Sequence, residues 1–206
     1  MAGFKVGFTN IAERERMGLP DSTYGYVMDD MVVASGGHLD TAARIAPRIE
    51  TEICVRLASD LNRADVTAAD VRAAGGAARA SFEVCDARII DWKCPYPDFF
   101  ADNGFSARIV LGDGEWRPLE DVDLLSEEVV LAEDGQVIAE GRGEMALGHP
   151  QNAVAWLARM LAQRGRDLRA GQLIMTGTLT PITPIERGSV YTATFSTLGT
   201  VEKTFV

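Results

Sequence analysis

The segment Arg48–Leu57 constrains the fold more than any other part of the chain. Its side chains alternate with a period of two, as in a β-strand with one buried face. The apolar run Ile53-Cys54-Val55 indicates a central strand rather than an edge strand. One face of this strand would carry Thr51, Ile53, Val55 and Leu57, and the other would carry Arg48, Glu50, Glu52, Cys54 and Arg56. We therefore expect a sheet with an apolar core on one side and charged side chains on the other.

The remaining pattern predicts a mixed, sheet-rich α+β fold with a few helices. Strand Phe4–Thr9 would place Phe4, Val6 and Phe8 on one face and Lys5 on the other, with Gly7 and Thr9. Period-two runs and glycine-bearing turns predict strands at 26–34, 82–90, 173–175, 189–195 and 201–205, and a sheet-forming stretch over 107–147. Helices are expected over 10–17 with Asn10 as cap, from the cap Thr67 to Ala80, and over 152–164.

Length and composition favour one globular domain, residues 1–206. The hydrophobic share of 47% is sufficient for a real core, which excludes disorder. Thirty acidic against twenty basic residues give a formal charge of −10, without a basic cluster for nucleic acid. No apolar run approaches the roughly 20 residues of a membrane helix, and the N-terminus lacks a signal-peptide layout. We therefore expect a soluble, cytoplasmic protein.

The three cysteines, Cys54, Cys85 and Cys94, predict neither a disulfide framework nor a thiolate zinc site, because the count is odd and no CxxC spacing occurs. Buried free thiols are the expected state. His149, before Pro150, is expected to be a buried or capping side chain, and Trp92 and Trp156 are expected in the core. With two histidines in the chain, any metal site would depend mainly on oxygen ligands.

The Glu50–Glu52 pair is the strongest candidate for a metal site. Both carboxylates would project from the same side of the strand, and two like charges at that spacing repel unless something neutralises them. Mg²⁺ or Mn²⁺ would do so and would keep positions for substrate oxygens. Glu83 could supply a third carboxylate, but spacing alone does not separate it from Asp86 or Asp91.

Several motifs, taken in order, resemble the metal-dependent 2-keto-4-pentenoate hydratase and 4-oxalocrotonate decarboxylase group of the fumarylacetoacetate hydrolase superfamily. The resemblance runs nearly end to end and implies the mixed β-sheet roll of that superfamily's C-terminal domain. The motifs are Gly3-Phe4-Lys5-Val6-Gly7-Phe8-Thr9, Pro47-Arg48-Ile49-Glu50-Thr51-Glu52-Ile53, Glu83-Val84-Cys85-Asp86-Ala87-Arg88-Ile89, Asp91-Trp92, Ala101-Asp102-Asn103, Leu147-Gly148-His149-Pro150, Ala155-Trp156-Leu157-Ala158 and Thr176-Gly177-Thr178.

The resemblance also implies roles for individual residues. Glu50, Glu52 and Glu83 would be the ligands of Mg²⁺ or Mn²⁺, and Lys5 would be an acid/base or substrate-orienting group. Asp102 and Asp21 would be further catalytic residues, with Asp21 standing in for an acidic residue that relatives carry where Thr23 stands here. The substrate would contact Thr9, Arg48, Phe105, Thr176, Gly177 and Thr178.

The implied activity is that of a lyase acting on small unsaturated 2-oxo acids in aromatic catabolism. A bound cation would stabilise the enolate common to hydration, decarboxylation and carbon–carbon cleavage, so the ligands do not name the reaction. Hydratase is favoured over decarboxylase. An acylpyruvate hydrolase ranks third, because the stretch Ile11–Gly18 has no histidine and Asp102 stands where hydrolases carry a lysine.

Three departures from the family pattern favour a fourth alternative, a catalytically silent partner subunit. Gly104-Phe105 replaces an Ala-Ser pair, Thr23 replaces the acidic residue, and the chain begins almost on the lysine-bearing strand, without the helical segment that precedes it in relatives. Lys5 is thus expected near a terminus that can fray. The expected partners are a 2-oxo acid and a second copy of the chain, or a homologous enzyme subunit.

Overall fold

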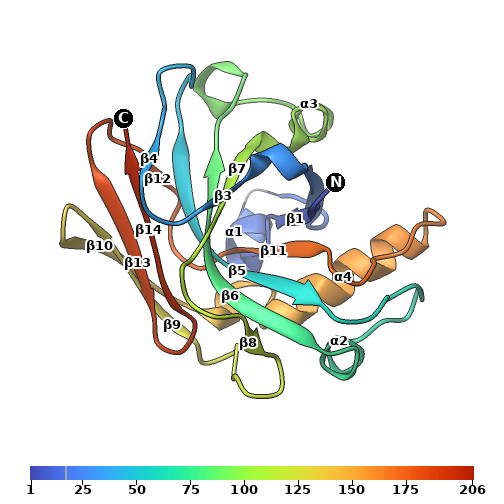
Figure 1. Cartoon of the computed structure of the whole chain (residues 1–206). Coiled ribbons are helices and arrows are strands. Elements are labelled where there is room, and N and C mark those ends of the chain that lie inside the picture. Colours follow the sequence, from blue (N-terminus) through green and yellow to red (C-terminus); the bar gives the residue numbers. More distant parts are fainter. Residues whose placement is uncertain (17) are drawn as a thin grey trace.

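The structure is a computed structural model that describes residues 1–16 and 18–206, and it contains two β-sheets packed around a shared apolar core (Figure 1). The larger sheet is mostly antiparallel, with parallel pairs between β1 and β11 and between β3 and β7. Its order is β2 (Thr23–Val27), β1 (Gly3–Gly7), β11 (Leu173–Thr178), β5 (Arg48–Leu57), β6 (Gly76–Cys85), β7 (Ser106–Leu111) and β3 (Val32–Ala34), with β12 (Thr183–Pro184) beside β5 and β8 (Arg117–Pro118) beside β6.

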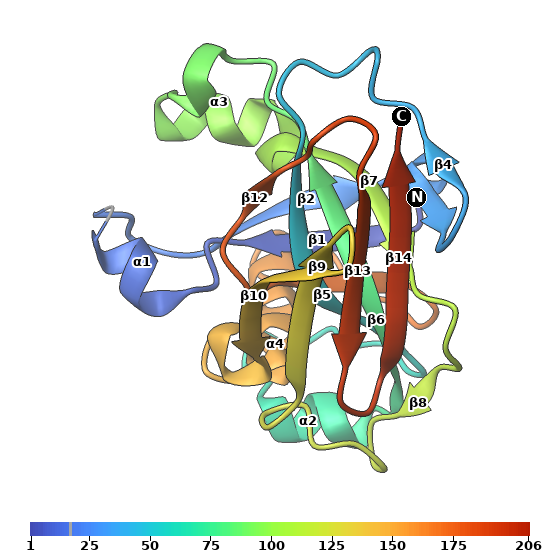
Figure 2. The same cartoon turned by 90° about the vertical axis from the view of Figure 1, so that its left-hand side faces the viewer.

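The smaller sheet covers one side of the larger one (Figure 2). Its neighbours are antiparallel except for the pair between β14 and β4. Its order is β10 (Gln136–Arg142), β9 (Glu128–Glu133), β13 (Val190–Phe195), β14 (Gly199–Phe205) and β4 (His38–Leu39).

The helices occupy two separate regions. Helix α4 packs on α2 and on β11, and its apolar side chains are buried. Helices α1 and α3 project together from one side of the larger sheet (Figure 2). The α-helices are α1 (Ile11–Arg16), α2 (Ala68–Ala73), α3 (Tyr96–Ala101) and α4 (Pro150–Ala162), and 3₁₀ turns cover Asp29–Met31, Ile90–Trp92, Asn103–Phe105 and Gly143–Met145. Among the described residues, no helix has the length and apolar character needed to cross a membrane.

Strand β5 is central, with the predicted bounds and the predicted division of its faces. Ile53, Val55 and Leu57 belong to the main core, together with side chains of α4 and of the smaller sheet. Cys54, on the opposite face, belongs to a small separate apolar cluster. The main core therefore stabilises β5 from one side and leaves the other side free for charged residues.

The predicted helix from Thr67 to Ala80 is too long. Thr67 does cap α2 in a capping box with Asp70, but the helix ends at Ala73. Residues from Gly76 onward pair with β5, as in the pair Ala78 and Val55. Pairing with a central strand outweighs the helix propensity of the alanines, which is a weak prior compared with tertiary contacts.

The other predicted elements agree in position and differ in their limits. The strand expected over 26–34 is divided between β2 and β3 by the turn Asp29–Met31. Helix α1 has the predicted cap, since the Asn10 side chain accepts a hydrogen bond from the Glu13 backbone at 3.0 Å, and residue 17 of that prediction lies outside the described residues. His149 caps α4 as expected, because its Nδ1 accepts from the Gln151 N–H at 3.0 Å.

Truncation of Leu157 tests the attachment of α4 to the core. Leu157 is fully buried, so Leu157→Ala should lower the free energy of unfolding by about 2–5 kcal/mol. Leu125→Ala, at a leucine that is 42% exposed, should change it by less than about 0.5 kcal/mol. Urea denaturation of both variants measures the difference, and equal values would contradict the assigned packing.

Candidate metal centre and active-site cavity

Three carboxylates meet on the face of the larger sheet that turns away from the main core. The register of β5 and β6 places Glu50 directly opposite Glu83, and Glu52 lies two residues along β5 on the same face. Glu52 and Glu83 are fully buried, and Glu50 is half-buried. The structure thus brings together the three acidic residues implied as ligands.

Most oxygens of the two buried carboxylates have no hydrogen-bond partner among the described residues. Glu52 Oε2 accepts from the Gly177 N–H at 2.8 Å, while Glu52 Oε1 and both oxygens of Glu83 are unpartnered. The nearest cation is the Lys5 ammonium, 3.5 Å from Glu83 Oε1. Buried carboxylate oxygens without partners are costly, and a divalent cation would satisfy them. The residues present therefore fit such an ion.

The electrostatics of the centre indicate excess negative charge. Burial, followed by the charge of Glu83, raises the pKa of Glu50 to about 7, although Lys5 acts in the opposite direction. The same two causes raise the pKa of Glu52. Burial alone would lower the pKa of Lys5, but the surrounding groups, Glu83 first, bring it above its ordinary value. One ammonium does not compensate three carboxyl groups, so some of them hold protons when no metal is bound.

The register separates Glu83 from the two acids that sequence left as alternatives. The Asp86 carboxylate accepts hydrogen bonds from the backbone N–H groups of Ile45 (3.1 Å) and Ala46 (2.9 Å), and thereby holds the segment before β5. Asp91 is exposed in a 3₁₀ turn. Of the three, Glu83 is the one that faces Glu50.

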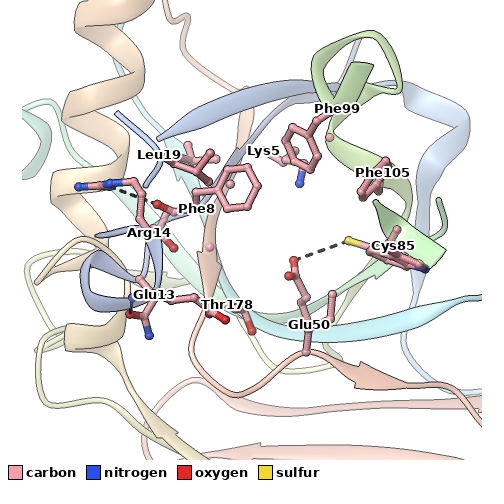
Figure 3. Close-up of a pocket in the computed structure, with 18 of the residues that line it drawn as sticks. Lys5, Phe8, Glu13, Arg14, Leu19, Glu50, Cys85, Phe99, Phe105 and Thr178 are labelled. Atoms are coloured by element: carbon pink, nitrogen blue, oxygen red, sulfur yellow. Dashed lines mark hydrogen bonds between the residues drawn. The ribbon is translucent and has the colours of Figure 1, made fainter. Parts of the chain in front are cut away.

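A cavity of about 310 Å³ opens beside these carboxylates, between the segments of α1 and α3, and Glu50 is the one of the three that lines it (Figure 3). Lys5 lies in its wall and is buried, because β1 is held between β2 and β11. Lys5 thus lies near the N-terminus, as expected, but in a strand that is paired on both sides. Gly177 allows the loop of β11 to approach closely, since it has a φ of 101° and a Cβ there would lie 1.9 Å from the Thr9 hydroxyl. The close approach places the Gly177 N–H against Glu52.

Five of the six predicted substrate contacts line this cavity, and Thr176 does not. The Thr176 side chain is buried and donates its hydroxyl hydrogen bond to the Ile53 carbonyl at 2.9 Å, so it joins β11 to β5. The contacts that line the cavity are Thr9, Arg48, Phe105, Gly177 and Thr178.

The structure does not bring Asp21 and Asp102 into the cavity lining. The Asp21 carboxylate is exposed and accepts a hydrogen bond from the Trp156 indole at 2.9 Å. The Asp102 carboxylate forms an ion pair with Arg88 and also accepts the Arg88 backbone N–H. Both carboxylates are thus taken up by contacts that hold segments next to the cavity.

Of the aromatic wall of the cavity, only Phe105 was predicted. Phe99 lies 4.8 Å from Phe8 and 4.9 Å from Phe105, measured between ring centroids. Phe8 lies beyond the end of β1 with a φ of 54°, so it leaves the core face expected from strict alternation. Trp92, expected in the core, also lines the cavity, with the Arg48 guanidinium 4.4 Å above its ring. The aromatic residues of α3 (Tyr96–Ala101) were the sequence feature from which this wall could have been predicted.

Cys85 is the other residue whose place sequence reasoning missed. Its Sγ lies 3.6 Å from Glu50 Oε2 in the cavity wall, where a structural thiol was expected (Figure 3). The period-two spacing from Glu83 places it on the carboxylate face, and that spacing was visible in the sequence.

Comparison with known proteins agrees with this geometry. Residues 6–206 match the family described as Fumarylacetoacetate (FAA) hydrolase C-terminal. The chain is 38% identical to a 2-keto-4-pentenoate hydratase of Burkholderia vietnamiensis and 37% identical to a 4-oxalocrotonate decarboxylase of Pseudomonas putida, in both cases over 100% of this chain and 78% of the relative.

A solved structure is similar at the level of the fold as well. It is a 4-oxalocrotonate decarboxylase from Pseudomonas putida G7, complexed with magnesium and adipate, with a TM-score of 0.96 and 36% sequence identity over 100% of this chain and 78% of that chain. The end-to-end family match and the shared sheet arrangement lead to one conclusion: the chain belongs to the fumarylacetoacetate hydrolase C-terminal family.

Proposed function

We propose that the chain is a divalent-metal-dependent lyase acting on small unsaturated 2-oxo acids, with the activity of a 2-keto-4-pentenoate hydratase. The observation that carries the proposal is the set of unpartnered, buried carboxylate oxygens of Glu52 and Glu83, which lie on the same sheet face as Glu50, beside a cavity that Glu50 and Lys5 line. The relatives named 2-keto-4-pentenoate hydratase, at 31–38% identity over the full chain, support it.

In this proposal Glu50, Glu52 and Glu83 hold Mg²⁺ or Mn²⁺. Hard cations of this kind prefer carboxylate oxygens and keep further positions for water and substrate. When bound, the ion would supply Lewis acidity to the 2-oxo group of the substrate. The Gly177 N–H fixes one oxygen of Glu52 and leaves the other free to face the ion. The magnesium-bound relative supports this choice of cation.

Lys5 would act as an acid/base or substrate-orienting group. Its pKa is raised above the ordinary lysine value by the carboxylates around it, Glu83 first, although burial acts against them. An ammonium in the wall of the cavity can attract an anionic substrate and can exchange a proton with it at Nζ.

Asp21 and Asp102 would be positioning residues in this proposal. Asp102 binds Arg88 next to the turn Asn103–Phe105, and Asp21 binds Trp156. The side chains that can contact a substrate directly are Thr9, Thr178 and Arg48, together with the rings of the aromatic wall. A mainly aromatic wall suits a short unsaturated tail.

A 4-oxalocrotonate-type decarboxylase is the second candidate, and one observation favours it. The guanidinium groups of Arg48 and Arg14 lie in the cavity lining, where either could bind a second carboxylate. The structural relative complexed with adipate, a dicarboxylic acid, supports the same alternative. Arg14 is already engaged with the Phe8 carbonyl and the Ser22 hydroxyl, so Arg48 is the stronger candidate.

Incubation with each substrate distinguishes the two candidates. With Mn²⁺ present, we expect loss of the ultraviolet absorbance of 2-hydroxypenta-2,4-dienoate without release of carbon dioxide, whereas carbon dioxide from 4-oxalocrotonate would favour the decarboxylase.

Lys5→Met serves as the control, because it should retain the ion and lose at least about 100-fold in kcat. If wild type leaves both substrates unchanged while a homologous enzyme consumes them, the silent-partner alternative replaces the proposal.

Substitution of two buried glutamates tests the metal centre. Glu83→Gln removes a carboxylate without hydrogen-bond partners, so Mn²⁺ affinity should fall by about 100-fold or more while the metal-free protein keeps its stability. Glu127 is equally buried but binds the Thr197 and Leu198 N–H groups. Glu127→Gln should therefore lower the free energy of unfolding by about 1–3 kcal/mol and leave Mn²⁺ affinity unchanged. Calorimetric titration and urea denaturation measure both effects, and loss of affinity in both variants would contradict the assignment.

The affinity for Mn²⁺ should depend on pH because the ion competes with protons. Burial and Glu83 raise the pKa of Glu50 to about 7, so below that pH the carboxyl is mostly protonated and the ion must displace the proton. We expect Mn²⁺ to bind at least about tenfold more weakly at about pH 6 than at about pH 8. Affinity that is constant over this range would contradict a ligand role for Glu50.

The single catalytic domain, the homo-oligomeric state and the cytoplasmic location belong to the same proposal. They rest on chain length, composition and the resemblance to the family, and they stay predictions.

A further inference from the structure

The carboxylate centre includes one sulfur atom that hard-metal chemistry does not need. Cys85 lies two residues after Glu83 on β6, so both side chains are on the same face of the sheet. Cys85 is 3% exposed, and its thiol donates a hydrogen bond to Glu50 Oε2, with Sγ 3.6 Å from that oxygen. Figure 3 shows the two side chains pointing toward one another across the cavity. Potential ligand atoms of Glu50, Glu83 and Cys85 all lie within 4.8 Å of one another.

A second observation points to a ligand at this place. Glu83 is fully buried, and both of its carboxylate oxygens are without hydrogen-bond partners among the described residues. The oxygens of Glu83 and the sulfur of Cys85 therefore face the same small space and do not satisfy each other. An ion that accepts both oxygen and sulfur would satisfy the Glu83 oxygens and would replace the hydrogen bond between Cys85 and Glu50.

The spacing fits a tetrahedral ion with mixed ligands. Zn²⁺ binds cysteine sulfur at about 2.3 Å and carboxylate oxygen at about 2.1 Å, so the tetrahedral angle separates these two atoms by about 3.6 Å. The separation between Cys85 Sγ and Glu50 Oε2 is 3.6 Å. Mg²⁺ takes oxygen ligands and gains little from sulfur, whereas softer ions are selected by thiolate.

We propose that Glu50, Glu83 and Cys85 form a second binding mode of this centre, in which a thiophilic divalent cation such as Zn²⁺ or Cd²⁺ is captured through the Cys85 sulfur and displaces Mg²⁺ or Mn²⁺. The proposal rests on the cation centre of the proposed function. On binding, the S–H bond breaks, its proton leaves to solvent, and a sulfur–metal bond forms without oxidation or reduction. A sulfur ligand would leave the ion one position fewer for substrate oxygens, so thiophilic ions should inhibit the enzyme.

Cd²⁺ binding to the metal-free protein gives a direct readout, because cadmium–thiolate bonds produce a charge-transfer absorption in the ultraviolet. Wild type should show this band with one equivalent of Cd²⁺. Cys85→Ser and Cys85→Val should lose the band and bind Cd²⁺ at least about tenfold more weakly, while their Mn²⁺ affinity changes by less than about threefold. Cys94→Ser is the matched control, because Cys94 lines the same cavity and lies outside the carboxylate cluster.

Each remaining outcome has a definite meaning. A band that persists in both Cys85 variants, or its absence from wild type that still binds Mn²⁺, would overturn the second binding mode and leave the proposed function standing. Absence of binding by both Mn²⁺ and Cd²⁺ in wild type would overturn both proposals. Retained Mn²⁺ affinity in the Cys85 variants also shows that the centre is folded, so a misfolded variant cannot pass for a positive result.

Discussion

The uncompensated negative charge of Glu50, Glu52 and Glu83 is the constraint on which the functional face depends. Three carboxyl groups share a buried space with one ammonium, that of Lys5, and burial without partners is unfavourable for ionised groups. The fold tolerates this because the opposite face of β5 lies in a continuous apolar core that supplies the stability. A cation bound by these carboxylates would therefore stabilise the folded protein.

Much of this arrangement follows from the alternation along one strand. The bounds of β5, its central position and the common face of Glu50 and Glu52 could be predicted, because a period of two assigns every side chain to a face. The choice of Glu83 over Asp86 could not, since it depends on the register between β5 and β6, which brings Glu83 opposite Glu50 and leaves Asp86 to bind backbone N–H groups. The alternation within one strand does not determine how that strand pairs with its neighbour, so the register could not be predicted from either strand alone.

The errors have a common physical origin in tertiary contacts. The helix expected to reach Ala80 ends at Ala73 because the following residues pair with β5. The catalytic role that the resemblance implies for Asp102 stays a prediction, and nothing in the sequence indicated that its carboxylate would pair with Arg88 beside the turn that presents Phe105. The local sequence pattern predicts which face of a strand a residue lies on. It does not predict which distant residue will pair with a carboxylate.

The walls of the cavity, rather than the carboxylates and Lys5, bear on which reaction the enzyme catalyses. Hydration and decarboxylation of 2-oxo acids need the same cation and the same ammonium, so Glu50, Glu83 and Lys5 do not discriminate between them. Residues of the cavity wall would therefore have to distinguish the two reactions. The rings of Phe99 and Phe105 form an apolar part of this wall. The guanidinium of Arg48, which lies over Trp92, offers one site for a second carboxylate. A guanidinium that stays stacked on its ring favours a substrate with one carboxylate, and one that leaves the ring to pair with substrate favours a diacid. In the proposed function, the balance between a cation–π contact and an ion pair at Arg48 would therefore help to select the substrate.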